Sequence, residues 1–441
     1  MKKRIKVLFT DLLYFNHNYG TQGLAFSMME KLSSQFDAKY TFVLPQGYPE
    51  EKDSLQEKYK FRVIIAPRLF FILGKLHFSI RLFYSLIKRR ASLPKAEERR
   101  FLILVNALKE SDVVIDLSGI EFIGNFPLRK RYADYLNISN MQWLAEKYKK
   151  LYLKYTKSYG PFPDKDILYR FLVKRCLNNL PFVLVRGKTN LNEVKKLNLD
   201  VPLYSFPEIS LSLKAESRSW ASNYISKLGV DASKSLVGLS PSAAIGRIRT
   251  KNDDNTSCGD NQVRLFKEIT KFYRSNDQQV LLIPHAVVDG KDLKYCDLAL
   301  SRKIYDEIND KKDVFIIEDM NLTYQQVRAI IGLLEFYVTG RYHSVSSALF
   351  MAVPTVVLSW HTKYKDILSL FSENFPIVDC RTNAVEKSVS LIKKAYFNRQ
   401  WFDRENVLEK KKEVDREIDE SIKIIVAEIE RNRLRENGKQ L

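Results

Sequence analysis

Between residues 336 and 359 the chain reads FYVTGRYHSVSSALFMAVPTVVLS, in which two short apolar runs flank a stretch rich in small residues. The runs at 336–339 and 355–358 have the length and composition of buried strands, and the stretch between them is typical of a helix. A strand, a helix and a second strand in this order are the unit from which parallel sheets are built. The stretch therefore predicts an α/β fold.

The same alternation continues along most of the chain. Further apolar runs predict strands at 7–10, 40–44, 62–66, 112–117, 151–156, 182–186, 203–205, 237–240, 280–283 and 314–317, with helices near 22–33, 95–110, 167–176 and 190–197. The pattern breaks near 213–217 and then starts again. We therefore expect an α/β protein of two Rossmann-like domains in a GT-B-like arrangement, residues 1–212 and 213–400, with a C-terminal bracing helix at 401–441.

The charge balance narrows the classes of ligand. The sequence has 72 Lys and Arg residues and 52 Asp and Glu residues, which gives a net charge of +20. Such a charge attracts nucleic acid, anionic membranes and phosphorylated ligands. The sequence has no RNP signature, zinc-finger spacing or basic zipper, so we expect no nucleic-acid partner. The four cysteines lie far apart without a C-x-x-C pair, which favours a reduced, cytoplasmic compartment and no metal site.

One segment complicates this interpretation. Residues 67–90 read PRLFFILGKLHFSIRLFYSLIKRR, with apolar residues at helical spacing and basic residues at both ends. Lys75, His77 and Arg81 make the segment a poor membrane span. It fits a helix packed on its own domain, which we favour, or a helix lying on an anionic membrane. Because the N-terminus lacks the apolar run of a signal peptide, we expect a cytoplasmic protein, with peripheral contact at the inner face of the membrane as the alternative.

In open parallel sheets, ligands bind beyond the carboxyl ends of the strands, so residues that follow strands are the candidates. The densest group follows the run at 336–339. Arg341 offers a bidentate fork, His343 a titratable ring and Ser344 a hydroxyl, at the start of a helix whose free N–H groups attract anions. Lys363 adds a cation after the next strand. This group predicts a site for a small phosphorylated anion.

Other strand ends carry weaker candidates. Arg186 at a helix start forms either an anion clamp or part of a surface charge pair. His285 has the place of a proton donor or phosphate ligand, although a lone histidine is more often structural. Asp116 and Glu121 beside a tight turn suit acid–base chemistry as well as ordinary capping or solvation.

The turn Asn18–Gly20 precedes a predicted helix. Its glycine allows backbone N–H groups to face an anion, and a plain turn between strand and helix explains it equally well.

Residues 340–366, GRYHSVSSALFMAVPTVVLSWHTKYKD, resemble the C-terminal signature of the polysaccharide pyruvyl transferases. That family has an R-x-H pattern, a helix of small residues, an apolar strand after proline and a trailing lysine. The matching residues here are Arg341, His343, Pro354 and Lys363, with weaker matches in the same order at Asn18–Gly20, Asp116–Gly119, Arg186 and His285. The N-terminal turn has Thr21 where the family has Asp, which leaves the identity of the acceptor open.

The resemblance implies transfer of pyruvate from phosphoenolpyruvate, a co-substrate, to two hydroxyls of one sugar in a polysaccharide or lipid-linked glycan precursor, without a cofactor. It assigns donor binding to Arg341, Lys363, Arg186 and Ser344, protonation to His343 or His285, acceptance of a sugar proton to Asp116 or Glu121, and acceptor binding to Asn18, Gly20 and Glu121. Two other classes stay open. One is a GT-B glycosyltransferase that uses a nucleotide sugar, and the other is a non-catalytic protein that binds polyanions or membrane surfaces.

Overall fold

The computed structural model of the protein describes residues 2–12, 15, 18–44, 49–67, 95–247, 258–287, 296–361 and 363–438. The chain forms two compact units. The first comprises residues 1–16, 25–208 and 417–441, and the second comprises residues 17–24 and 209–416. The two interpretations of segment 67–90 concern residues that, apart from Pro67, lie outside the described part of the chain.

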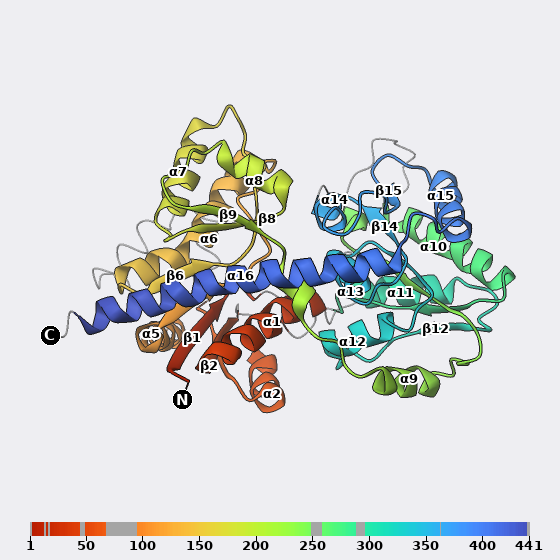
Figure 1. Cartoon of the computed structure of the whole chain (residues 1–441), viewed down its shortest axis with the longest axis horizontal. Coiled ribbons are helices and arrows are strands. Elements are labelled where there is room, and N and C mark those ends of the chain that lie inside the picture. The colour runs from red at the N-terminus through yellow and green to blue at the C-terminus, as the bar shows by residue number, and fades with distance from the viewer. Residues whose placement is uncertain are drawn as a thin grey trace. The chain divides into compact units, whose positions relative to one another are not determined.

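The first unit is built on a sheet of five parallel strands in the order β3-β2-β1-β4-β6 (Figure 1). The strand order therefore reverses between β1 and β4. Two small parallel sheets, β5-β7 and β8-β9, complete the unit. The strands are β1 (Arg4–Thr10), β2 (Asp37–Leu44), β3 (Arg62–Ile65), β4 (Val113–Asp116), β5 (Ile120–Glu121), β6 (Leu151–Lys154), β7 (Ser158–Tyr159), β8 (Val183–Arg186) and β9 (Leu203–Phe206).

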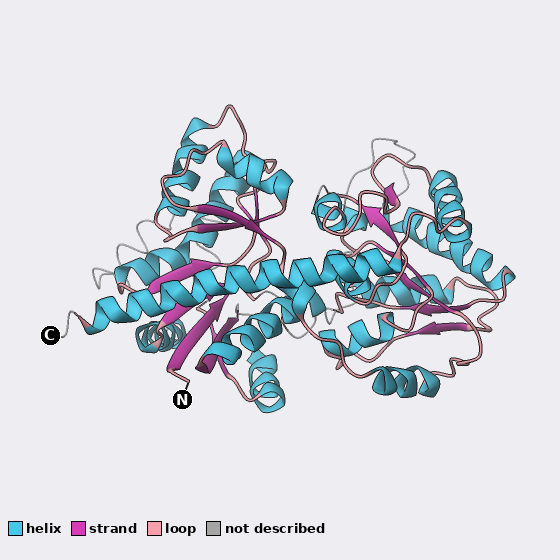
Figure 2. Cartoon of the chain, viewed as in Figure 1, coloured by secondary structure: helices cyan, strands magenta, loops and turns pink. Residues whose placement is uncertain are grey.

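Helices cover both faces of this sheet (Figure 2). They are α1 (Tyr19–Gln35), α2 (Pro49–Tyr59), α5 (Lys95–Glu110), α6 (Leu128–Lys147), α7 (Ile167–Asn178) and α8 (Lys188–Lys195). The predicted helix at 95–110 coincides with α5, which buries Leu104, Val105 and Leu108 because these residues share one helical face. The sequence did not predict α6.

The second unit has six parallel strands in the order β12-β11-β10-β13-β14-β15, which is the strand order of a complete Rossmann sheet. The strands are β10 (Leu236–Ser240), β11 (Gln279–Leu282), β12 (Val314–Ile316), β13 (Phe336–Thr339), β14 (Thr355–Ser359) and β15 (Ile377–Asp379). The helices are α9 (Arg218–Lys227), α10 (Cys258–Ser275), α11 (Asp297–Asp306), α12 (Tyr324–Ile331), α13 (Tyr342–Phe350), α14 (Lys363–Leu368), α15 (Val385–Phe397) and α16 (Arg404–Asn437), of which α16 extends into the first unit. The predicted α/β fold, with parallel sheets in two halves of the chain, is confirmed.

The last helix returns to the N-terminal domain, as predicted. From Glu417 onward α16 belongs to the first unit, where Ser421 shares a hydrogen bond of 2.7 Å with the Tyr155 hydroxyl. Lys31 and Asp419 form an ion pair at 2.6 Å. None of the helices in the described ranges is both long and apolar enough to cross a membrane.

Candidate active site

In the second unit the strand order reverses between β10 and β13, whose carboxyl ends are in register at Ser240 and Thr339. Open α/β sheets bind ligands at such a reversal because the loops after the two strands diverge and leave room. Helix α13 begins directly after β13, and His285 follows β11 on the other side of β10. The residues predicted from the C-terminal signature therefore gather at the place that this fold uses for ligands.

Arg341 is the N-cap residue of α13, and its side chain is anchored by a carboxylate. Its Nε and Nη2 atoms donate to Asp297 Oδ2 and Oδ1 at 2.7 and 2.5 Å. Burial alone would lower the pKa of Arg341, but the Asp297 carboxylate outweighs it and raises that pKa. The guanidinium is thus held in one orientation and stays protonated, as binding of an anion requires.

Asp297 itself is fully buried at the start of α11. Besides Arg341 it accepts hydrogen bonds from the backbone N–H groups of Ala243 and Ala286, each at 2.8 Å. One carboxylate therefore ties together the segments that follow β10, β11 and β13. The sequence analysis did not single out Asp297, because it lies well beyond the strand end that it organises.

His343 lies in the first turn of α13, half-buried, and its ring packs directly on Gly20. A Cβ atom at residue 20 would lie 2.1 Å from His343 Nδ1, so only glycine allows this approach. The backbone of His343 is also held, because the Tyr324 hydroxyl donates to its carbonyl oxygen at 3.1 Å. Arg328, which is fully buried, in turn donates to the Tyr324 hydroxyl at 2.6 Å. The predicted residues Gly20 and His343 are thus brought together, and Tyr324 and Arg328 are supports that the sequence analysis missed.

His285 is 2% exposed, and neither ring nitrogen has a hydrogen-bond partner among the described residues. Burial, followed by the charges of His343 and Arg341, lowers its pKa well below 6.5. At neutral pH this imidazole is therefore uncharged, and it can donate an N–H to an anion but is a poor general acid. The environment of His285 favours ligand binding over proton transfer, and its catalytic role stays a prediction.

Three other predicted residues have partners in the same unit. Ser344 is buried, and its hydroxyl shares a hydrogen bond with the Tyr337 hydroxyl. Lys363 begins α14, with its ammonium 4.4 Å from the centroid of the Trp360 ring. Asn18 accepts from the backbone N–H of Gly20 at 3.0 Å, as an N-cap residue of α1 does. The roles of Ser344 and Lys363 in donor binding, and of Asn18 and Gly20 in acceptor binding, stay predictions.

This end of the second unit offers several donors to an anion. The first N–H groups of α13 have no partner within their helix, and a helix N-terminus favours negative charge. Ser242, after β10, has a fully buried hydroxyl without a hydrogen-bond partner in the described ranges. No group of His, Cys, Asp and Glu side chains among the described residues is arranged to hold a metal ion. These donors would suit a phosphate or carboxylate group.

The first unit contains a different cluster, at the reversal of its own sheet. Asp116 ends β4, Glu121 ends β5, and both face two lysines that the sequence analysis missed. Lys154 Nζ lies 3.0 Å from Asp116 and 2.8 Å from Glu121, and Lys157 Nζ lies 2.5 Å from Asp116 and 3.0 Å from Glu121. All four side chains are at most 2% exposed. Two buried cations thus balance two buried carboxyl groups.

The two carboxyl groups differ in their affinity for protons. Burial would raise the pKa of Asp116, but Lys154 and Lys157 outweigh it and hold that pKa well below its usual range. Burial raises the pKa of Glu121, although the same lysines oppose the shift. Asp116 is therefore held as a paired anion, which favours a positioning role over that of a base. The predicted proton transfer by Asp116 and acceptor binding by Glu121 remain predictions.

Asp11 directly follows β1 and adds a third carboxyl group to this cluster. Burial and the negative charge of Asp116 raise the pKa of Asp11 to about 7, since Lys154 and Lys157 are already matched by two carboxyl groups. Its backbone is left-handed, with a φ of 61°, which aspartate tolerates better than most residues. The pKa of Asp11 is thus near neutral, and no sequence pattern marked this residue.

Arg186 also lies in the first unit, at the end of β8. Its guanidinium forms an ion pair with the buried Glu208 at 2.8 Å and donates to the carbonyl oxygen of Gly119 at 3.2 Å. The structure therefore places Arg186 in a different unit from Arg341. Its predicted contact with the donor stays a prediction.

A family model described as polysaccharide pyruvyl transferase matches residues 53–362, which is more than half of the chain. The chain belongs to this family. The matched range includes Asp116, Arg186, His285 and His343, whereas the turn Asn18–Gly20 lies before it. Among curated proteins the sequence has no significant match.

Solved structures with a similar fold are distant in sequence from this pyruvyl transferase family member. UDP-GlcNAc 2-epimerase from Neisseria meningitidis, bound to UDP-GlcNAc, is 9% identical over 97% of this chain and 100% of that chain, with a TM-score of 0.53. The α,α-trehalose 6-phosphate synthase from Burkholderia multivorans is 9% identical over 100% of this chain and 99% of that chain, with a TM-score of 0.54. These likenesses show the fold, which is of the GT-B type, as predicted.

Proposed function

We propose that the protein transfers pyruvate from phosphoenolpyruvate onto two hydroxyls of one sugar in a polysaccharide or lipid-linked glycan precursor. The products are a cyclic ketal and phosphate. The observation that supports this proposal best is the arrangement after β13, where Arg341 is fixed by Asp297 at the start of α13 and His343 stands one turn into the helix. A charged fork, helix N–H groups and a titratable ring suit a donor that carries a phosphate and a carboxylate and must accept a proton.

In this proposal Arg341, the N-terminus of α13 and the neutral His285 hold the donor's anionic groups. His343 gives a proton to the methylene carbon, which becomes a methyl group and leaves positive charge on the neighbouring carbon. One sugar oxygen bonds to that carbon and loses its proton, and the bond to the phosphate oxygen then breaks. The second sugar oxygen closes the ketal as its own proton leaves. Of the two protons released, one returns to His343 and one leaves with phosphate.

A GT-B glycosyltransferase that uses a nucleotide sugar is the second candidate. The neighbour bound to UDP-GlcNAc supports it at the level of the fold, and the anion site would also accept a diphosphate. The family match favours pyruvyl transfer. A cytoplasmic location, with glycan precursors reached at the inner face of the membrane, belongs to the same proposal. It is supported by Cys176, Cys296 and Cys380, which are free.

A thermal-shift experiment with phosphoenolpyruvate, UDP and GDP separates these candidates. A ligand at 100 times its Kd stabilises the folded state by about 2.7 kcal/mol. We expect a shift with phosphoenolpyruvate, loss of most of that shift in Arg341→Lys, and little change in the unliganded Tm. Arg381→Lys is the matched control, because Arg381 also forms a two-point pair with a strand-end aspartate, Asp379, in the same unit.

Turnover tests the proton donor. With a competent acceptor, His343→Asn should lower kcat by about 10²–10⁴-fold, which is the usual contribution of general acid catalysis. A shift with UDP or GDP but none with phosphoenolpyruvate would favour the glycosyltransferase. If His343→Asn reacts at the wild-type rate, the proton comes from elsewhere and our assignment is wrong.

A further inference from the structure

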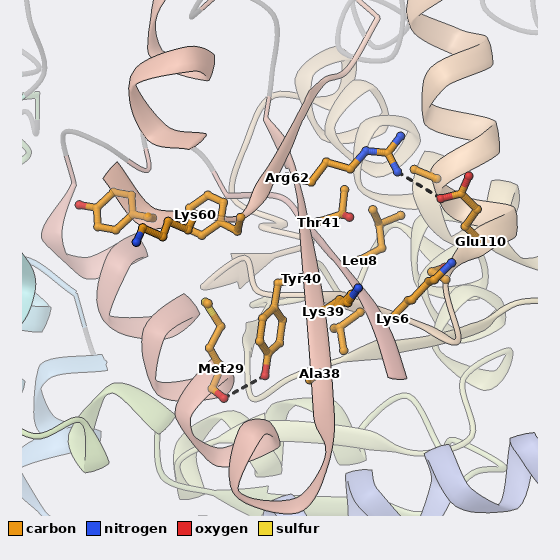
Figure 3. Close-up of a pocket in the computed structure, with 15 residues that line it drawn as sticks. Lys6, Leu8, Met29, Ala38, Lys39, Tyr40, Thr41, Lys60, Arg62 and Glu110 are labelled. Atoms are coloured by element: carbon orange, nitrogen blue, oxygen red, sulfur yellow. Dashed lines mark hydrogen bonds and ion pairs between the residues drawn. The ribbon is translucent and has the colours of Figure 1, made fainter. Parts of the chain in front are cut away.

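The sheet of the first unit has a gap at its amino-terminal edge. Strand β2 begins at Asp37, opposite Arg4 of β1, whereas β3 begins only at Arg62, opposite Thr41. Residues 37–40 of β2 therefore have β1 on one side and no described strand on the other. A cavity of about 430 Å³ lies at this gap (Figure 3). We call it the sheet notch and define it by Lys6, Lys39, Lys60, Arg62 and Glu110, which are among the residues that line it.

The charges around the sheet notch are mostly positive. Lys6 and Lys39 are directly opposite each other in register, and like charges at opposed positions of neighbouring strands repel. Lys60 and Arg62 add two cations, and Figure 3 shows Lys60 and Arg62 on opposite sides of β2. Glu110 is the acidic residue of the lining, and it is engaged with Arg62 at 3.1 Å.

Counter-charges near the notch do not cancel this excess. Helices α2 and α5 end here, and each helix C-terminus contributes about half a negative charge. Two more charged residues lie at the margin of the sheet notch. Asp112 accepts from the backbone N–H of Lys6 at 2.7 Å, and Lys150 donates to the carbonyl oxygen of Ser111 at 2.9 Å. Their opposite charges cancel. Counted over both sides of β2, four cations against Glu110 and two half-charges leave about two positive charges.

The backbone of Lys60 is unusual for a lysine. This residue directly follows α2 and is left-handed, with a φ of 56°, and its N–H donates to the carbonyl oxygen of Gln56 at 2.9 Å. Glycine is the residue most often found at this position of a helix end, because a Cβ atom is unfavourable there. A cation therefore stands at the rim of the notch where a neutral glycine would fit the backbone better.

We propose that the sheet notch is a second anion site, which binds the phosphate or diphosphate group of a soluble molecule or of a lipid headgroup. It is separate from the charged cluster of the same unit. Lys6 is four residues before Thr10, the β1 residue in register with Asp116, and at roughly 3.3 Å per residue this is about 13 Å of strand. The proposal does not depend on pyruvyl transfer, and its cavity size suits a small head group.

Inorganic pyrophosphate is the probe, with binding followed by calorimetry at low salt. We expect Lys39→Gln and Lys60→Gly each to weaken pyrophosphate binding about 5–10-fold, as expected for loss of one charge-assisted contact. Lys195→Gln, an exposed lysine on α8, is the matched control and should change binding less than about 2-fold. Lys60→Gly also shows that weaker pyrophosphate binding is not caused by misfolding. Glycine suits the left-handed backbone, so Tm should stay equal or rise.

Vesicles distinguish the two sources. Phosphatidylcholine vesicles with and without phosphatidylglycerol are floated with the wild-type protein and the same variants. Loss of vesicle binding in Lys39→Gln and Lys60→Gly indicates a lipid headgroup, and loss of pyrophosphate binding alone indicates a soluble ligand. If both variants bind pyrophosphate and vesicles as tightly as the wild type, the sheet notch is not an anion site. That result leaves pyruvyl transfer untouched, because Arg341→Lys tests it separately.

Discussion

Replacing Asp11 by asparagine should stabilise the protein above pH 7 and change its stability little near pH 4. Burial and the charge of Asp116 raise the pKa of Asp11 from 3.8 to about 7. The folded protein therefore binds this proton more tightly than the unfolded chain does. The stability that the proton provides is complete below pH 4 and is lost as the pH rises through 7. Asparagine is neutral at every pH and does not suffer this loss.

The size of the pKa shift of Asp11 sets the expected gain in stability. A pKa difference of about 3 units corresponds to about 4 kcal/mol, because each unit is worth about 1.4 kcal/mol. Asp11 is partly exposed, so this figure is an upper bound. We expect Asp11→Asn to gain about 2–4 kcal/mol over the wild type between pH 4.5 and pH 8. For a unit of this size that gain corresponds to a rise of roughly 4–16 °C in Tm at the higher pH.

Urea unfolding at pH 4.5, 6, 7 and 8, followed by tryptophan fluorescence, measures this gain. Asp37→Asn is the matched control, since Asp37 is an exposed carboxylate paired with Arg4 at the start of β2. The control should show no gain that grows with pH. If Asp11→Asn loses the same stability at pH 4.5 as at pH 8, Asp11 is ionised and paired in the folded protein, and the charge balance described for the cluster is wrong.

Three further changes test other features. Lys154→Met leaves two buried carboxyl groups facing Lys157 alone, and urea unfolding should show a loss of about 3–5 kcal/mol; an unchanged midpoint would contradict the pairing. Gly20→Ala places a Cβ atom 2.1 Å from His343 Nδ1 and should displace the His343 ring. We expect kcat to fall about 10²-fold with a small change in Tm. A wild-type rate would show that His343 tolerates displacement. If segment 67–90 lies on an anionic membrane, which is the alternative to packing on its own domain, the protein should float with anionic liposomes at low salt and be released at high salt, since each basic residue near the surface contributes about 1 kcal/mol; absence of binding at low salt would exclude this membrane contact.

The strands were predictable because a strand buried on both faces reads as a continuous apolar run. Val113–Asp116, for example, is buried at all four residues. Helix α6 was missed for the opposite reason. Its buried residues include Ser139, Asn140 and Gln142, so its apolar residues do not form a clear stripe. The structure shows why polar residues are tolerated there, since Gln142 donates to the carbonyl oxygen of Cys176 at 2.7 Å.

The residues of the candidate site likewise divide into those that the sequence identified and those that it did not. Arg341 and His343 were identifiable because the strand end, the fork and the helix start are consecutive in the sequence. Asp297 and Lys154 were not, because their importance depends on which strands are neighbours. Lys154 meets Asp116 only because β4 and β6 pair in the register that sets these two residues side by side. No local pattern contains that register, so the sequence identified Asp116 only as a candidate for acid–base chemistry or for ordinary capping.

Each unit is completed by a piece of chain from far away in the sequence. Residues 417–441 complete the unit that contains β1, and residues 17–24 complete the unit that contains β13. A ribosome that adds about 5–20 residues per second needs about 20–90 s to make all 441 residues. During that time the nascent N-terminal sheet lacks α16, and the Tyr155 hydroxyl lacks its hydrogen-bond partner Ser421. The first unit is therefore complete only once residues 417–441 have been made, and separately expressed halves divided near residue 208 would each lack a structural part.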